Sequence, residues 1–187
     1  MIRRKGFMGK TVEISDRLKQ LKETDTERYY VFYPRLSRLY PVSGDMRVMT
    51  LNEKALHLLR MIHGYKVYIL TDKDNVVKGS ILFSKGGSYR YPFATKRDLI
   101  DGPSFTVPEF RGQGVAVRLG DAIMNEFEQD YDIVYGTIKE DNIPSLKRVQ
   151  KNGFIVESKL KIDKLRRFQK SEEGDHVLVA YKNIRKR

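Results

Sequence analysis

The chain has 187 residues, which favours a single domain, and 40% of them are hydrophobic, which is enough to fill a core. It contains no cysteine and only three widely separated histidines, so a disulfide, a thiolate nucleophile and a zinc site are not expected. No apolar run reaches the roughly 18 residues of a membrane helix, and the 36 Lys and Arg against 24 Asp and Glu favour a polyanionic partner such as nucleic acid, acidic lipid or a phosphorylated cofactor.

The N-terminal part of the chain gives the weakest structural signals. Apolar residues at helical spacing predict a helix over residues 14–24. The aromatic segment 28–41 is broken by Pro34 and Pro41, and it fits either a strand or a loop whose aromatic side chains line a cleft. One apolar face predicts a clearer helix over residues 50–65. The basic N-terminus is not followed by a long apolar stretch, so we expect no secretory signal and a cytoplasmic protein.

From residue 66 on, strand and helix signals alternate. Strands are predicted over 66–72, 76–84, 97–107, 131–138, 154–162 and 176–183, and helices over 114–129 and 142–154. The first two strands flank a Lys-Asp-Asn turn and should form a hairpin, and Gly102 and Pro103 predict a bulge or an irregular edge in the third. This order predicts an α/β or α+β fold with helices on the faces of a mixed central sheet.

A glycine-containing turn joins the strand at 97–107 to the following helix. Gly112 and Gly114 stand where the helix begins, and Arg111 precedes them. A helix N-terminus has unpaired N–H groups and partial positive charge, and glycine lets an anion approach the backbone, so this turn predicts a phosphate site. The dinucleotide fingerprint fails because its third glycine would fall on Val117, and the Gly-Lys-Ser/Thr of a nucleotide-triphosphate loop is absent.

Two segments together resemble the GNAT family of N-acetyltransferases. The first is the pyrophosphate-binding pattern, in which Arg111, Gly114 and Ala116 follow the turn Pro108, Glu109 and Phe110. The second follows the next strand and consists of Asn142, Ser145, Gly153 and Phe154. The resemblance is good over 66–154, extends to 182 and does not cover 1–50. The alternative is that the glycines serve only the turn and that Asn142 is only a helix cap.

The resemblance implies a single GNAT-like domain over 1–187, with a sheet of about six or seven strands, helices on both faces and two splayed strands that form a CoA cleft. The core cofactor-binding region would be 66–154, and 1–50 would be an extension on the acceptor side. The pantetheine arm would bind the strand before the motif, and the pyrophosphate would bind the helix start. The implied cofactor-binding residues are Ser104, Phe105, Thr106, Arg111, Gly112, Gln113, Gly114, Val115, Ala116, Val117, Asn142 and Ser145.

Catalysis in such enzymes is direct attack of an amine on the acetyl-CoA thioester, without a metal. The tyrosine that often protonates the CoA thiolate falls at Val149, which can donate no proton. Ser145 and Tyr181 are the substitutes that we consider, although the first can be merely a small residue at a helix start and the second a core or surface residue. The candidates for the general base are Glu109, Glu140 and Asp141, each of which also has a structural reading as a turn or helix-start residue.

The expected activity is transfer of an acetyl group from acetyl-CoA to a primary amine, on a small molecule or an amino sugar. Alternatives are a protein N-terminal or lysine acetyltransferase, or a non-catalytic module that binds CoA or nucleic acid. We expect the segments 28–41, 86–96 and 161–175 to build the acceptor pocket. In the first of these, Tyr29, Tyr30, Tyr33 and Tyr40 would form a wall, with Arg35 and Arg38 near an acceptor phosphate or carboxylate, unless the aromatics only anchor the segment to the sheet. The chain would be a monomer or a homodimer.

Overall fold

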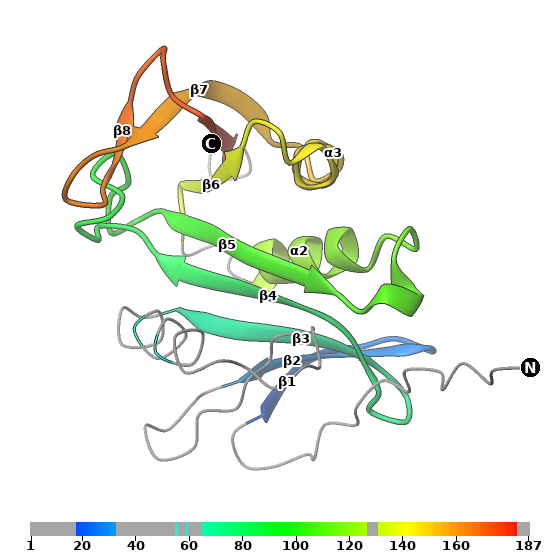
Figure 1. The fold of residues 1–187 in the computed structure, drawn as a ribbon. Helices are drawn as coiled ribbons and strands as arrows, with labels where there is room; N and C mark the ends of the chain where they lie inside the picture. The colour runs from blue at the N-terminus through cyan, green and yellow to red at the C-terminus, as the bar shows by residue number, and fades with distance from the viewer. Residues whose placement is uncertain (1–17, 33–54, 56–58, 60–64, 127–130, 183–187) are drawn as a thin grey trace, which may run out of the picture.

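Nine strands form one mixed sheet in the computed structural model, which describes residues 18–32, 55, 59, 65–126 and 131–182. In chain order the strands are β1 (Leu18–Glu23), β2 (Glu27–Phe32), β3 (Lys66–Asp72), β4 (Val77–Lys85), β5 (Leu99–Thr106), β6 (Ile133–Lys139), β7 (Ile155–Ile162), β8 (Phe168–Lys170) and β9 (His176–Lys182). Their order in the sheet is β1-β2-β3-β4-β5-β6-β9-β7-β8 (Figure 1). The helices are the short 3₁₀ turn η1 (Pro108–Phe110), α2 (Val115–Glu126) and α3 (Ile143–Lys151).

The α+β class and every element predicted from residue 66 onward are confirmed, but the sheet is larger than expected. The additional strands are the hairpin β1–β2 and the short β8. The helix predicted over 14–24 is wrong for its described part, because residues 18–23 form β1 and pair with β2. Of the helix predicted over 50–65, only Ala55, Leu59 and Tyr65 are described; Ala55 and Leu59 are helical, and Tyr65 lies outside any helix or strand. No described helix is long and apolar enough to cross a membrane.

The aromatic residues of β2 anchor the N-terminal hairpin to the sheet. Tyr29 and Tyr30 are buried, and β2 pairs with β3 along its whole length. The Tyr30 hydroxyl donates a hydrogen bond to Asn75 Oδ1 at 3.1 Å, in the turn between β3 and β4. The described part of segment 28–41 is therefore a strand rather than a cleft-lining loop. The other residues proposed for a wall, Tyr33, Arg35, Arg38 and Tyr40, lie outside the described residues.

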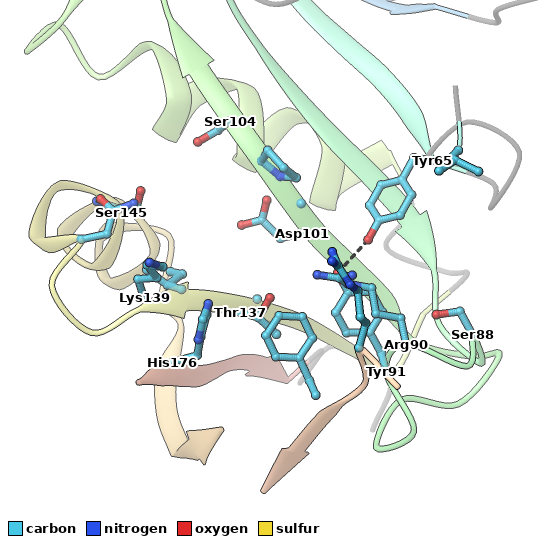
Figure 2. A pocket seen from close by; sticks show the side chains of 18 of the residues that line it. Tyr65, Ser88, Arg90, Tyr91, Asp101, Ser104, Thr137, Lys139, Ser145 and His176 are labelled. Carbon is cyan, nitrogen blue, oxygen red and sulfur yellow. Dashed lines mark hydrogen bonds between the residues drawn. The ribbon is translucent and has the colours of Figure 1, made fainter. Parts of the chain in front are cut away.

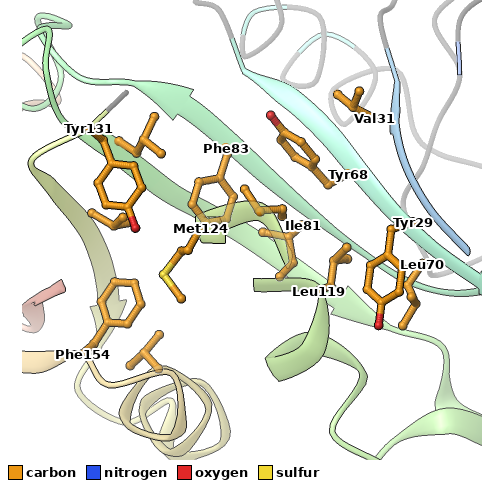
Figure 3. Packing of buried hydrophobic residues seen from close by; sticks show 14 of the residues in the cluster. Tyr29, Val31, Tyr68, Leu70, Ile81, Phe83, Leu119, Met124, Tyr131 and Phe154 are labelled. Atoms are coloured by element: carbon orange, nitrogen blue, oxygen red, sulfur yellow. The ribbon is translucent and has the colours of Figure 1, made fainter. Parts of the chain in front are cut away.

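Helices α2 and α3 cover one face of the sheet and enclose its main core (Figure 3). Val115, Leu119 and Ile123 recur at four-residue spacing, and all three are buried as the sequence predicts; Phe127, the next in this series, is not described. On the opposite face, a second cluster is covered in part by residues 86–98, which contribute Tyr91 and Ala94. A helix on that face remains a prediction, because segment 50–65 is almost entirely outside the described residues.

Strands β5 and β6 are the one parallel pair among the described strands, and they stay together for only three positions. Leu99 to Asp101 pair with Val134 to Gly136. Gly102 and Pro103 then form the predicted bulge opposite Leu82 of β4. A Cβ on Gly102 would lie 2.8 Å from the Leu82 carbonyl oxygen, so the bulge requires glycine there. Beyond it, β5 continues along β4 while β6 continues along β9, and the two strands separate.

A buried carboxylate ties the N-terminal hairpin to the rest of the domain. Glu27 of β2 is 5% exposed, and it accepts hydrogen bonds from Arg118 Nη2 of α2 at 2.7 Å and from Lys78 Nζ of β4 at 3.0 Å. Burial by itself would raise the pKa of the Glu27 carboxyl, but the hydrogen bonds from these two cations outweigh it, and the pKa lies below its ordinary value of 4.5. Glu27 therefore stabilises the fold in its ionised form.

Replacing Glu27 with glutamine should lower the free energy of unfolding by about 2 kcal/mol at neutral pH, the range for a buried hydrogen bond to a charged group. Because the folded pKa is depressed, this stabilisation is present above pH 4.5 and is lost as the pH falls through the folded pKa. Chemical denaturation at a series of pH values measures both effects. Glu23→Gln is the matched control, since Glu23 is an exposed carboxylate in the same hairpin with salt bridges to Arg28 and Lys73. Equal losses in the two variants would contradict the role of Glu27.

Candidate functional site

A cavity of about 650 Å³ opens where β5 and β6 separate (Figure 2). This volume lies within the range of small-molecule sites. Its lining comes from β5, β6, the start of α3, the loop 86–98, the turn between β7 and β8, and the start of β9. Ser145 of α3 and Arg90 of the loop stand at opposite ends, with Asp101 between them. The cavity thus runs from the helix side of the sheet toward the aromatic cluster on the other face.

Asp101 and Arg148 form an ion pair in the middle of this cavity. The Asp101 side chain is 1% exposed and the Arg148 side chain 11%, and Arg148 Nη2 donates to Asp101 Oδ2 at 2.5 Å. Asp101 Oδ1 and Arg148 Nε have no hydrogen-bond partner among the described residues. Burial raises the pKa of the Asp101 carboxyl above its ordinary value of 3.8, and the Arg148 guanidinium opposes this rise only in part. Asp101 is thus a buried carboxylate in the cavity lining, with one oxygen that has no hydrogen-bond partner among the described residues.

The sequence did not single out Asp101 or Arg148. An acidic residue directly before the Gly102-Pro103 bulge, in the strand that leads to the glycine turn, was the signal that could have identified the first. Arg148 lies one position before Val149 on α3, and the two side chains have different surroundings. Val149 is fully buried in the core beneath α2, whereas Arg148 lines the cavity. The position that the family resemblance assigns to a thiolate donor therefore does not line the cavity.

The glycine turn before α2 has the geometry of an anion site. Gly112 and Gly114 have φ of 78° and 72°, a left-handed conformation that glycine adopts without strain. The first turn of α2 contains no acidic residue that could compete with a bound anion. Arg111 stays close to the turn, because its Nε donates to the Thr106 carbonyl at 3.2 Å. The backbone N–H groups at the start of α2 are thus available to a phosphate.

Three of the predicted cofactor-binding residues line the cavity directly: Ser104, Asn142 and Ser145. Asn142 caps α3, where its Oδ1 accepts a hydrogen bond from the Ser145 backbone N–H at 3.3 Å. The other predicted residues are not part of the lining. Phe105 and Thr106 are the last residues of β5, and the run from Arg111 to Val117 forms the glycine turn and the start of α2. The structure therefore brings the predicted cofactor residues to one end of the splayed strands.

Most of the predicted catalytic residues do not line the cavity. Ser145 lines the cavity, but Glu109 is exposed in η1, and Tyr181 packs against Phe154 with ring centroids 5.8 Å apart. Glu140 forms an exposed salt bridge with Lys159. Neither Glu109, Glu140, Asp141 nor Tyr181 lines the cavity. Within the described part of the chain, no cluster of three or more metal-ligating side chains occurs.

Two of the three segments predicted to build the acceptor pocket do line the cavity. Residues 88–91 contribute Ser88, Tyr89, Arg90 and Tyr91, and the link 161–175 contributes Leu165, Arg166 and Phe168. Tyr65 joins them, and its hydroxyl donates a hydrogen bond to the Tyr91 hydroxyl at 2.9 Å (Figure 2). The described residues of the third segment, Tyr29 and Tyr30 among them, lie in β2 and do not line the cavity.

Comparison with solved structures finds the same fold in acetyltransferases at low sequence identity. The spermidine N-acetyltransferase of Vibrio cholerae, solved with CoA and spermine, is 15% identical over 75% of this chain and 79% of its own, with a TM-score of 0.52. A GNAT-family acetyltransferase from Bacillus anthracis is 18% identical over 73% of this chain and 76% of its own, with a TM-score of 0.52. The yncA protein of Salmonella typhimurium, solved with its cofactor acetyl-CoA, is 19% identical over 74% and 76%, with a TM-score of 0.51.

No protein-family model matches the sequence, and no curated protein matches it. The identification rests on the three-dimensional arrangement, in which a mixed sheet parts between two parallel strands and the strand before the gap leads through a glycine turn into a helix. The solved structures with this arrangement are named as acetyltransferases, two of them with CoA or acetyl-CoA bound. The chain therefore has the fold of the GNAT acetyltransferases.

Proposed function

We propose that this protein transfers the acetyl group of acetyl-CoA to a primary amine of a small molecule. The observation that carries the proposal is the position of Asp101. This carboxylate is buried at the point where β5 and β6 separate, in a cavity that has a cofactor-type glycine turn near one end and an aromatic, basic lining at the other. The acetyltransferases that share the fold, with CoA or acetyl-CoA in their structures, support acetyl-CoA as the donor.

Acetyl-CoA would bind along the side of β5 that faces the gap. Residues 104–106 pair with β4 on one side and with no residue of β6 on the other. Their unpaired backbone groups can form sheet-like hydrogen bonds with the amides of the pantetheine arm. The pyrophosphate would lie on the backbone N–H groups after Gly114, where the helix start and Arg111 supply positive charge. The thioester would then reach the cavity beside Asp101.

The reaction needs a proton acceptor, and Asp101 is suited to that role. The amine nitrogen forms a bond to the thioester carbonyl carbon, the carbon–sulfur bond breaks, and the proton lost by the amine passes to Asp101 Oδ1. A pKa above the ordinary carboxyl value brings the base nearer to neutral pH. Arg148 would offer a positive charge to the departing thiolate, and the Ser145 hydroxyl would be a further donor in the same cavity.

The size of the cavity favours a compact acceptor. Its volume of about 650 Å³ would include the space for the end of the pantetheine arm, and its lining comes from several separate segments of the chain. The spermidine N-acetyltransferase that shares the fold acts on a small amine, which supports the same class of acceptor here. Its acceptor is a polycation, however, and a lining with four Lys and Arg side chains against one carboxylate would repel a second positive charge.

The cofactor site can be tested by an isosteric pair at Gly114. Asparagine and aspartate both tolerate the left-handed backbone found there, with φ of 72°, and they differ only in charge. A carboxylate close to the pyrophosphate should weaken CoA binding about fivefold or more relative to Gly114→Asn, because two like charges about 4 Å apart repel by about 1 kcal/mol even in water. Isothermal titration with CoA measures the difference. Equal affinities in the two folded variants would refute this location of the pyrophosphate.

The catalytic role can be tested by Asp101→Asn, which keeps the shape of the side chain and removes its basicity. We expect turnover of acetyl transfer to fall by about 10² to 10⁴, the usual contribution of a general base. CoA affinity should be unchanged. In the unmodified enzyme, kcat/KM should fall as the pH decreases through the raised pKa of Asp101, and this acid limb should disappear in the variant. Turnover within tenfold of the unmodified enzyme, or an unaltered acid limb, would rule out Asp101 as the base.

A further inference from the structure

We propose that the acceptor amine carries a carboxylate or a phosphate group, which Arg90 and Arg166 bind at the end of the cavity away from α3. This inference rests on the proposed acetyl transfer and specifies its substrate class. The amino group of such an acceptor would approach Asp101, and its anionic group would approach the two arginines. The acceptor would therefore be bound at two points of opposite charge.

The charges of the lining residues are the first support. Arg90, Lys139, Arg148 and Arg166 face the cavity, and Asp101 is the only acidic residue among the described lining residues. The guanidinium of Arg148 is already paired with Asp101. The described part of the chain supplies no salt-bridge partner for Arg90 or Arg166, so their charges are left for a ligand.

Two acidic side chains near this end of the cavity are already paired. Asp163, in the turn that carries Arg166, forms a salt bridge with Arg167 at 2.7 Å. Asp175 accepts a hydrogen bond from the His176 ring at 2.7 Å when that nitrogen is protonated. Neither carboxylate lines the cavity. The potential at this end is therefore positive, which attracts an anion and disfavours a polyamine.

Arg90 is held on an aromatic platform. The rings of Tyr91 and Phe168 stack with their centroids 5.5 Å apart and an angle of 6° between their planes. The Arg90 guanidinium carbon lies 5.0 Å from the Phe168 ring centroid, and the Arg90 carbonyl accepts a hydrogen bond from the Phe168 N–H at 3.0 Å. A guanidinium that rests on a ring keeps its N–H edge free for a carboxylate or a phosphate. The platform thus fixes a cation without neutralising it.

Arg166 occupies a backbone position that does not favour arginine. Its φ is 59°, in the left-handed region, which residues other than glycine, asparagine and aspartate adopt only with strain. The turn is held by Asp163, whose Oδ1 accepts hydrogen bonds from the Leu165 and Arg167 backbone N–H groups. Glycine would fit this turn with less strain, so the arginine side chain is not there for the stability of the turn. Its position in the cavity lining points to a role in binding.

The decisive measurement compares acceptors in matched pairs that differ only by the anionic group. Glucosamine 6-phosphate is compared with glucosamine, phenylalanine with phenylalaninamide, and spermidine serves as a polycation. We expect kcat/KM to be at least tenfold higher for the anionic member of an accepted pair, and this preference to shrink as salt screens the arginines. Equal or better use of the neutral members, or exclusive use of spermidine, would overturn the inference.

The same amines also separate failure of this inference from failure of the proposed function. Absence of transfer to every amine would count against acetyl transfer. In that case the melting temperature of the protein with CoA is measured with each amine. If the anionic amine binds better than its neutral counterpart, it must raise the melting temperature further. No such rise would overturn the inference, and a rise would support it.

Two variants test the residues themselves. Arg166→Gly removes the charge and relieves the backbone strain at this position, so the melting temperature of this variant should be unchanged or higher. Arg90→Gln removes the charge above the stacked Tyr91 and Phe168 rings. Each should reduce the preference for the anionic member on the order of tenfold, the loss expected for a hydrogen bond to a charged group. Lys164→Gln is the control, since Lys164 is an exposed cation of the same turn that does not line the cavity. A preference unchanged in both arginine variants would refute the assignment.

Discussion

The ion pair between Asp101 and Arg148 is the contact on which the arrangement of the site depends. It joins β5 to α3 across the opening between the splayed strands, just where the parallel hydrogen bonds stop. A buried ion pair is weak support for stability, because desolvation offsets most of its attraction. Here each partner also keeps one buried polar atom that has no hydrogen-bond partner among the described residues. The pair therefore makes more sense as an arrangement for chemistry than as a means of stabilising the fold.

The surrounding fold positions this pair through backbone geometry. The bulge at Gly102 and Pro103 turns β5 away from β6 immediately after Asp101, and Gly102 is required because β4 approaches too closely for a side chain. The α3 cap at Asn142 sets where that helix begins, and hence which side its sixth residue, Arg148, presents to the gap. At the other end of the cavity the stacked Tyr91 and Phe168 rings join the loop 86–98 to the start of β8, which is far from it in the sequence. Local turn chemistry thus decides which long-range contacts can form.

Features that depend on short stretches of sequence were predictable, and features that depend on distant contacts were not. The glycine turn and the α3 cap follow from residues within a few positions of one another. Asp101 was missed because its partner lies 47 residues away, and a lone acid in a strand has no local signature. Residues 18–23 resemble a helix because leucines recur at a spacing of three, yet pairing with the aromatic strand β2 determines their structure. The loops 86–96 and 161–175 could be assigned to the pocket only by composition, since their meeting depends on the whole sheet.

The brief pairing of β5 with β6 has a mechanical consequence. Among the described residues, the strand pairing between the five-stranded part of the sheet and the part formed by β6, β9, β7 and β8 consists of three residue pairs. The short β5–β6 pairing interrupts the hydrogen-bond ladder that elsewhere makes the sheet stiff across its strands. A pantetheine arm hydrogen-bonded to β5 would occupy the gap between β5 and β6 in the way that an added strand would. The donor substrate would thereby strengthen the connection between the two parts of the sheet. Binding of acetyl-CoA would then also make the sheet stiffer.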